Sequence, residues 1–255
     1  MLQWVKIEDL VIDPGYQRPI VGKGRRNVDR IASSFAWSCF APVVVSPVQG
    51  GKFAIIDGQH RTTAAALVGL ETIPCQVVIA TRDQQAAAFK AINGMTTPIS
   101  RMSLHAAALI AGEFSAKQVT DVCSKANVEL LRYPVRTDKQ APGQTMAVAA
   151  ITSCLKRYGA ATLITALRCV TQTSNNKAGV LTAHVIKALC ATLHPVPYWR
   201  EGGLALIDAF ESIDLQEIQK VSTVDAASKQ ISKPQAMSSR IRDELRRRLP
   251  QRTAA

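Results

Sequence analysis

The chain has 255 residues, of which 47% are hydrophobic and 20% are charged. This balance excludes disorder over the whole length, because the apolar residues fall in periodic groups that can form the core of one large domain or two ordinary ones. No uncharged apolar run approaches the roughly 18 to 20 residues of a membrane helix, and the N-terminus has no signal-peptide pattern, so we expect a cytoplasmic, globular protein.

The charge is strongly basic, with 31 Lys and Arg against 19 Asp and Glu and a net charge of +12. Residues 1–100 carry +3, residues 101–255 carry +9, and the segment 229–252 alone carries +6. Such an excess favours a polyanionic partner or an anionic ligand. The six cysteines form no C-x-x-C pair, which predicts reduced thiols, mostly in the core, rather than a zinc or dithiol site.

The first hundred residues predict short strands that alternate with helices. Turn signals and apolar periodicity place strands at 7–12, 43–46, 53–56 and 73–79, and helices at 27–37, 62–68 and 83–92. The two middle strands are predicted to form a hairpin, because only a Gln-Gly-Gly-Lys turn separates them.

From residue 101 the chain becomes rich in Ala, Leu and Ile, which predicts an almost entirely helical part. Helices are expected at 103–112, 116–126, 145–158, 161–170, 181–193 and 203–210. We therefore predict three parts: a domain at 1–100, a helical domain at 101–228, and a basic amphipathic helix and tail at 229–255.

The segment 55–65 carries the most informative chemistry of the chain. A buried strand ends in an Asp-Gly turn, and a helix is predicted to begin directly after it. Helix N-terminal amides lack intrahelical partners and carry the positive end of the dipole, so they favour a bound phosphate. Arg61 can add a bidentate fork, His60 a further donor, and Thr62 and Thr63 their hydroxyls.

Asp57 is the carboxylate of this loop, and it does not favour a bare phosphate. It is the candidate metal ligand and, with His60, a candidate catalytic residue, because a carboxylate can hold a cation, orient a histidine or accept a proton. The alternative for the whole segment is an ordinary Asp-Gly turn with His60 and Arg61 solvated on the surface.

The sequence Asp57-Gly58-Gln59-His60-Arg61 resembles the signature of the ParB N-terminal / sulfiredoxin-like superfamily. Four more segments resemble the pattern of this superfamily in the same order: 13–19 (DPGYQRP), the helix at 28–35, and the Pro-led strands at 42–45 and 73–77. The likeness covers roughly residues 5–95. It implies an α+β fold class, a small ParB/sulfiredoxin-like mixed sheet domain, which is here followed by an all-helical domain.

The resemblance also implies a nucleotide site. Its phosphate cradle would consist of Gly58, Gln59, His60, Arg61, Thr62 and Thr63, covered from the facing loop by Gln17 and Arg18. A third family segment, E-N-x-x-R, corresponds to residues 91–97, where Asn93 fits and the Glu and Arg are missing. The expected cofactors are a nucleoside triphosphate, CTP or ATP, and Mg²⁺.

The function implied is a nucleotide-linked DNA-binding protein of the ParB type, in plasmid or chromosome maintenance (partition) or transcription control. DNA and nucleotide are then the expected partners, a homodimer is left open, and no membrane is expected. Two alternatives remain. One is an enzyme of the same fold, either a metal-dependent nuclease or NTPase or a small-molecule, serine-type phosphotransferase. The other is a protein-interaction module with a vestigial loop.

Sulfiredoxin chemistry is disfavoured because Gln59 stands where a thiolate is needed. Residues 116–128 have the apolar spacing of the first part of a helix-turn-helix, with Asn127 suited to a left-handed turn. Pro134 would cut the recognition helix to one turn, so ordinary helix packing is the preferred interpretation. His105, His184 and His194 are isolated, and we interpret them as structural.

The C-terminal segment predicts an amphipathic basic helix, with apolar residues at steps of four from Met237 to Leu249. Five arginines surround this stripe and are the candidate DNA-binding residues: Arg240, Arg242, Arg246, Arg247 and Arg248. Arginines clustered on one helix can neutralise several backbone phosphates at once. The alternative is a terminal helix that docks by its apolar face and leaves these arginines in water.

Overall fold

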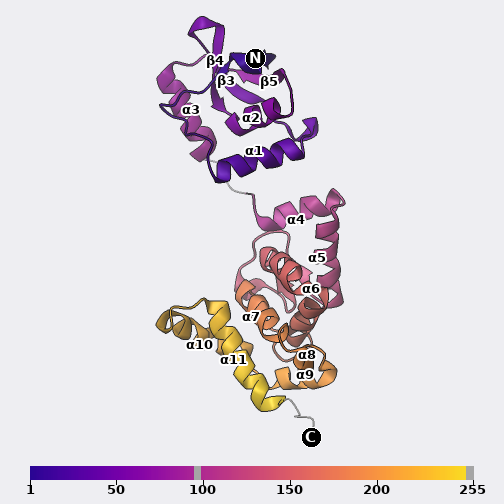
Figure 1. Cartoon of the computed structure of the whole chain (residues 1–255). Helices are drawn as coiled ribbons and strands as arrows, with labels where there is room; N and C mark the ends of the chain where they lie inside the picture. The colour runs from indigo at the N-terminus through magenta and orange to yellow at the C-terminus, as the bar shows by residue number, and fades with distance from the viewer. Residues whose placement is uncertain (95–98, 251–255) are drawn as a thin grey trace. The chain divides into compact units, whose positions relative to one another are not determined.

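A computed structural model of the chain describes residues 1–94 and 99–250 (Figure 1). The chain forms two compact units, Met1–Pro98 and Ile99–Ala255. Two of the predicted features lie partly outside the described residues: the third family segment from residue 95 on, and the C-terminal tail from residue 251 on. In the part that the structure describes, no helix is both long enough and apolar enough to cross a membrane.

Unit 1 is built on a five-stranded mixed sheet with the strand order β1-β5-β3-β4-β2. Its strands are β1 (Leu2–Lys6), β2 (Leu10–Val11), β3 (Val43–Val48), β4 (Lys52–Asp57) and β5 (Thr72–Val77). β1 is antiparallel to β5 and β3 to β4, while β3 runs parallel to β5 and β2 to β4. The predicted hairpin is present, closed by Gly50 and Gly51 with φ of +80° and +71°.

Three helices pack around this sheet: α1 (Lys23–Ser33), α2 (Gln59–Leu67) and α3 (Arg82–Gly94). α1 packs on α2, and α3 packs on β4. The first two begin earlier than predicted, at residue 23 instead of 27 and at residue 59 instead of 62. Their first turns carry polar side chains, so apolar periodicity gave no signal there.

Unit 2 is helical. Its helices are α4 (Arg101–Ile110), α5 (Phe114–Lys125), α6 (Val148–Thr171), α7 (Ala183–Leu193), α8 (Pro197–Arg200), α9 (Gly203–Glu211), α10 (Leu215–Ser228) and α11 (Lys233–Arg248). α7 is central, because both α6 and α11 pack against it. The two helices predicted at 145–158 and 161–170 form one element, α6, which bends at Gly159. α10 was not predicted, because only Leu215 and Ser222 of its residues are buried and its apolar pattern is weak.

A short parallel pair, β6 (Glu129–Leu130) and β7 (Gln144–Thr145), follows α5. Asn127 has a φ of +53°, the left-handed conformation expected of it. The chain then enters β6 instead of a recognition helix, so a helix-turn-helix does not continue after Asn127. Cys39 is exposed and the other five cysteines are buried, all as free thiols.

Candidate functional site

The site begins at the turn between β4 and α2. Gly58 is the N-cap of α2 and has a φ of +103°, a left-handed conformation that L side chains rarely adopt. A Cβ atom there would lie 3.0 Å from a Val43 methyl group. Glycine therefore allows the strand to pass into the helix within one residue, and no side chain caps the first N–H groups of α2.

Arg61 lies in the first turn of α2 and is only about a quarter exposed. Its Nη2 donates to Asp57 Oδ2 at 3.0 Å and to the Pro42 carbonyl at 3.3 Å. Its Nε is buried and has no hydrogen-bond partner among the described residues. Because an unmade buried hydrogen bond is costly, this N–H is a donor available to a ligand.

The hydroxyls of Thr62 and Thr63, both predicted phosphate donors, form hydrogen bonds within α2 in this structure. Thr62 Oγ1 donates to the Gly58 carbonyl at 3.2 Å and Thr63 Oγ1 to the Gln59 carbonyl at 2.9 Å. Neither residue lines the cavity next to the loop. Both hydroxyls are engaged by the carbonyl four residues earlier, which is a common alternative for threonine inside a helix.

A cavity of about 590 Å³ lies at this end of the sheet, within the size range of small-molecule sites. The predicted residues that line it are Gln17, Arg18, Asp57, Gly58, Gln59, His60, Arg61 and Asn93. Several other lining residues were not predicted from the sequence, among them Lys23, Gly24, Asn27, Ile31 and Phe89. The structure thus brings together residues from the 13–21 loop, α1, α2 and α3.

The N-terminus of α1 is the second helix end at this cavity. Its N-cap, Gly22, has a φ of +52° and provides no side-chain cap, and Lys23 and Gly24 line the cavity. A Cβ on Gly24 would lie 3.1 Å from His60 Nε2, so the first turns of α1 and α2 are in close contact. Two uncapped helix N-termini therefore place positive dipole ends at one cavity.

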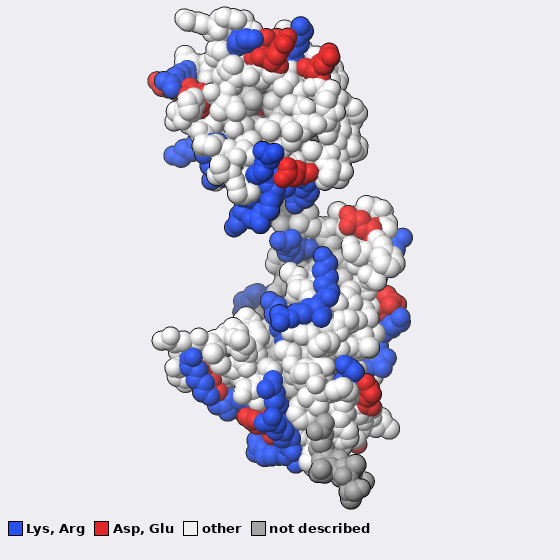
Figure 2. Space-filling view, in the orientation of Figure 1, with Lys and Arg blue, Asp and Glu red and all other residues white. Residues whose placement is uncertain are grey.

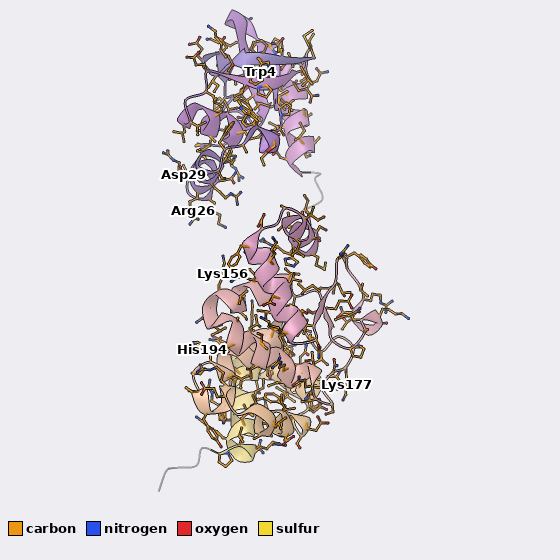
Figure 3. All side chains as sticks on the ribbon, turned by 90° about the vertical axis from the view of Figure 1, so that its right-hand side faces the viewer. Trp4, Arg26, Asp29, Lys156, Lys177 and His194 are labelled. Carbon is orange, nitrogen blue, oxygen red and sulfur yellow. The ribbon has the colours of Figure 1, made fainter. Side chains whose placement is uncertain are left out.

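α1 adds formal charge to this region. Lys23, Arg25, Arg26 and Arg30 are exposed, and Asp29 is the only acidic residue of the helix. Lys and Arg side chains gather on the lower part of unit 1, which contains α1 (Figures 1 and 2). Arg26 and Asp29 extend outward from α1 (Figure 3). The mouth of the site therefore lies next to a basic helix.

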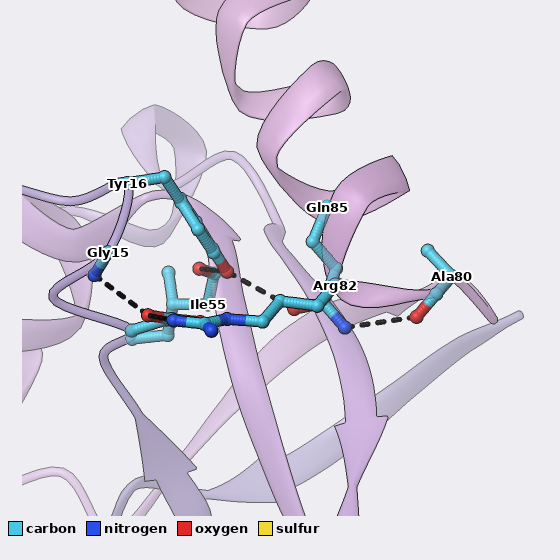
Figure 4. A network of polar contacts seen from close by, with 7 residues as sticks. Gly15, Tyr16, Ile55, Ala80, Arg82 and Gln85 are labelled. Atoms are coloured by element: carbon cyan, nitrogen blue, oxygen red, sulfur yellow. Dashed lines mark hydrogen bonds and ion pairs between the residues drawn. The ribbon is translucent and has the colours of Figure 1, made fainter.

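Gln17 is held rigidly at the wall of the cavity. It is 5% exposed, and its Nε2 donates to the Ile55 carbonyl at 2.5 Å. Tyr16 Oη donates to the same carbonyl at 3.2 Å and to Gln85 Oε1 on α3 at 3.3 Å (Figure 4). Gln17 Oε1 has no partner among the described residues, so it offers a buried acceptor to a ligand.

An ion pair ties the same loop to the start of α3. Arg82 donates to both carboxylate oxygens of Asp13, at 2.7 and 3.0 Å, and the Gly15 N–H donates to Asp13 Oδ1 at 2.8 Å. These hydrogen bonds, with that from Arg82 the largest cause, lower the pKa of Asp13. α3 in turn places Phe89 and Asn93 in the cavity lining. This ion pair, the Asp13–Arg82 clasp, thus connects the 13–21 loop to α3, and both of these elements line the site.

Asp57 is the only acidic residue that lines the cavity, and it is paired with Arg61. Residues 1–94 and 99–250 contain no group of three or more His, Cys, Asp or Glu that could hold a metal ion. A Mg²⁺ ion often uses one or two carboxylates together with substrate phosphates. The residues present therefore fit an ion whose other ligands are phosphate oxygens and water.

The five arginines predicted to bind DNA have different environments on α11. Arg240 pairs with Asp225 of α10, while Arg247 and Arg248 both pair with Glu244 of α11 itself. Arg246 lies 3.8 Å from Asp243, and Arg242 has no ion pair among the described residues. Basic and acidic side chains alternate in the lower part of unit 2, which contains α10 and α11 (Figure 2). Met237, Ile241 and Leu245 are fully buried, so the apolar stripe of α11 is docked, as the alternative interpretation of this helix expected.

Unit 1 thus combines a mixed sheet, a strand–glycine–helix turn, a facing loop and two helix N-termini at one cavity. Residues 3–94 match the family model described as the ParB N-terminal domain. The predicted resemblance to the ParB N-terminal family is confirmed over these residues, and the predicted α+β fold followed by a helical part is confirmed.

Three solved structures are similar to the chain. The C-terminally truncated chromosome-partitioning protein ParB from Caulobacter crescentus matches in a complex with CTP-gamma-S, with 17% identity, a TM-score of 0.43, and coverage of 73% of this chain and 98% of that chain. The same protein complexed to the centromeric parS site matches with 19% identity, a TM-score of 0.32, and coverage of 82% and 97%. The Pnob8-like ParB-N domain matches with 14% identity, a TM-score of 0.32, and coverage of 96% and 88%. No curated protein gives a significant match to the chain.

Proposed function

We propose that this protein is a nucleotide-linked DNA-binding protein of the ParB type, which binds a nucleoside triphosphate in unit 1 and DNA through its basic helical unit. One observation carries the nucleotide half of the proposal. Two uncapped helix N-termini and the buried, unpartnered Nε of Arg61 meet at one cavity of about 590 Å³. Such an arrangement is suited to a polyphosphate.

The residues that line the cavity have different roles in this proposal, according to their positions. The first N–H groups of α2 and α1 face the phosphates, and Lys23 and Arg18 supply charge at the rim. Arg61 exchanges its contact with Asp57 for one with a phosphate, since a doubly charged phosphate group is the stronger partner. Gln17 and Phe89 provide a buried acceptor and an apolar surface for the rest of the nucleotide. A Mg²⁺ ion would reach Asp57 together with the phosphates and would neutralise part of their charge.

DNA is the partner that best fits the charge of the helical part. Residues 101–255 carry +9, and Arg246, Arg247 and Arg248 are exposed at the end of α11. Arg246 pairs with the exposed Asp243, and such surface pairs contribute only about 0.3 to 0.5 kcal/mol, so Arg246 can turn to a backbone phosphate at little cost. Arg247 and Arg248 both pair with Glu244, which is only 23% exposed, so a backbone phosphate would compete with this carboxylate for them. Partition, plasmid maintenance and transcription control are the roles that such coupling would serve.

The proposal is tested by measuring nucleotide and DNA binding on the full chain. Calorimetry with CTP, ATP, GTP and UTP, with and without Mg²⁺, identifies the nucleotide. Fluorescence anisotropy with a labelled duplex then shows whether that nucleotide changes the affinity or the dissociation rate of DNA. We expect Arg61→Ala to remove the nucleotide effect while DNA binding without nucleotide persists. The proposal is wrong if none of the four nucleotides binds, or if bound nucleotide leaves DNA binding unchanged.

A further inference from the structure

Unit 2 contains a second cavity, of about 880 Å³, between α6, α7 and α11. Its lining is polar and basic: Ser153, Cys154, Arg157, Tyr158, His184, Lys187, Ser232, Gln235, Ser238, Ser239 and Arg242, together with Ala183, Ala191 and Pro234. No Asp or Glu is among these residues. It is formed entirely within unit 2 and shares no residue with the cavity of unit 1.

Helical periodicity explains why these side chains meet. α11 packs its apolar stripe against the core. A neighbouring face of the same helix carries Gln235, Ser239 and Arg242, which are spaced by four and three residues and all line the cavity. His184 and Lys187 share a face of α7 in the same way. α7 and α11 are in direct contact beside the cavity, because the hydroxyl oxygens of Thr192 and of Ser238, which lines the cavity, lie 2.9 Å apart. The cavity is therefore a groove in the surface of unit 2: Cys154 and Ser238 are buried in it, while Arg157, His184 and Lys187 are exposed.

Three cations from three different helices line this cavity: Arg157 of α6, Lys187 of α7 and Arg242 of α11. Within residues 1–94 and 99–250, none of the three is within ion-pair distance of a carboxylate, although four other arginines of α11 are. Like charges held together without counter-charge raise the local positive potential. Such a cluster favours an anionic ligand.

Lys187 and Arg157 also contribute to the pKa shifts of two neighbouring groups, although neither is the largest cause. The pKa of His184 is lowered, first by burial and then by the positive charges of Lys233 and Lys187. Lys187 and Arg157 contribute to lowering the pKa of the Cys154 thiol, after a hydrogen bond with Cys190. α7 and α11 also begin at this cavity, and although Thr182 and Ser232 cap them, the positive ends of both helix dipoles remain there.

We propose that this cavity is a second phosphate-binding site, in which Arg157, Lys187 and Arg242 hold one phosphate group between three helices. The phosphate can belong to a DNA backbone or to a free phosphorylated small molecule, because both present the same charged oxygens. The site does not depend on nucleotide binding in unit 1. If DNA is its source, it assigns a DNA contact to Arg242 and to two residues outside α11.

The test uses the full chain with Arg61→Ala, so that the cavity of unit 1 contributes little to phosphate binding. In this background, the double variant Lys187→Gln/Arg242→Gln is compared with the control Lys156→Gln/Lys177→Gln. The control removes the same charge from two exposed residues that lie outside the cavity lining (Figure 3). Thermal unfolding confirms that both variants fold.

One arm measures binding of inorganic pyrophosphate by calorimetry, and the other measures binding of a labelled duplex by anisotropy over a range of salt concentrations. A phosphorylated small molecule as ligand predicts that the cavity variant loses at least about tenfold in pyrophosphate affinity, as expected when a charge-assisted hydrogen bond is removed. A DNA phosphate predicts a loss of DNA affinity and a log-log salt slope smaller by about 0.9 for each phosphate that is no longer neutralised. The proposal is overturned if the cavity variant equals the control in both arms. Nucleotide binding in unit 1 is measured separately on the chain with Arg61 intact, so the two proposals fail independently.

Discussion

Arg61 and Asp57 form an ion pair across the first turn of α2, with 3.0 Å between Nη2 and Oδ2. Each side chain is about a quarter exposed. The pair holds the guanidinium at the edge of the cavity while its Nε remains buried and without a partner among the described residues. The Asp57 carboxylate thus contacts the Arg61 guanidinium that was predicted to bind phosphate. A phosphate at this site would compete with the carboxylate for Arg61.

Arg61→Ala should weaken nucleoside triphosphate binding by about 1 to 3 kcal/mol, because it removes a charge-assisted hydrogen bond. Isothermal titration calorimetry measures the change. Arg25→Ala is the matched control, since Arg25 is an exposed arginine of α1 that does not line the cavity. Equal affinities of the Arg61 variant and the wild type would remove Arg61 from the site.

Asp57→Asn should strengthen triphosphate binding in the absence of Mg²⁺ by about tenfold or less, because a partly exposed ion pair is worth about 1 kcal/mol. In the presence of Mg²⁺ the gain should shrink, and any metal-dependent turnover should be lost, since Asp57 is the only acidic residue of the lining. Calorimetry and a phosphate-release assay measure the two effects. Turnover at the wild-type rate would show that Asp57 holds neither the metal nor a proton.

Gly58→Ala should destabilise unit 1 by more than about 1 to 2 kcal/mol, the ordinary cost of a left-handed conformation for a residue with a Cβ. The extra cost comes from the Val43 contact at 3.0 Å. Gly69→Ala separates the two causes, because Gly69 has a φ of +80° but no neighbouring atom within 4 Å of the position that a Cβ would take. Calorimetric unfolding should show the larger loss of stability for Gly58→Ala, and equal losses would contradict the steric argument.

The Asp13–Arg82 clasp should make the stability of unit 1 depend on pH. The pKa of Asp13 is lowered in the folded state, so its contribution is fully present above the ordinary value of 3.8 and is lost as the pH falls through the folded value. Denaturant unfolding should therefore show wild type more stable than Arg82→Gln at neutral pH, with the difference disappearing at strongly acidic pH. A difference that stays constant below pH 3.8 would rule out this ion pair as its cause.

Ile241→Ala should destabilise unit 2 by about 2 to 5 kcal/mol, because Ile241 is fully buried between α11 and its neighbours. For the same reason, deletion of residues 236–255 should unfold the unit and would not isolate the role of the arginines. Arg246→Ala is the control, since its side chain is largely exposed, and it should change stability by less than about 0.5 kcal/mol. Thermal unfolding of both variants checks this, and an Ile241 variant as stable as the control would place α11 outside the core.

Much of the candidate nucleotide site could be predicted because its central part is local. A strand that ends at Asp57, a glycine, and a helix that begins at Gln59 are neighbours in the sequence, and the backbone alone brings them together. Thr62 and Thr63 show what the residue type alone does not give. It suggested hydroxyl donors to a phosphate, while the hydrogen bonds of these hydroxyls to the carbonyls of Gly58 and Gln59 follow from their place in the helix.

Lys23, Gly24 and Phe89 could not be predicted as parts of the site, because α1 and α3 reach it only through their packing on α2 and β4. The sequence of α11 determined by itself that one stripe is apolar and the rest is basic, since helical periodicity assigns each residue to a face. Only the tertiary structure decided that Arg240 pairs with Asp225 while Arg242 enters a cavity with Lys187. The reason is physical: the period of a helix fixes which residues share a face, but the neighbouring helices fix what each face meets.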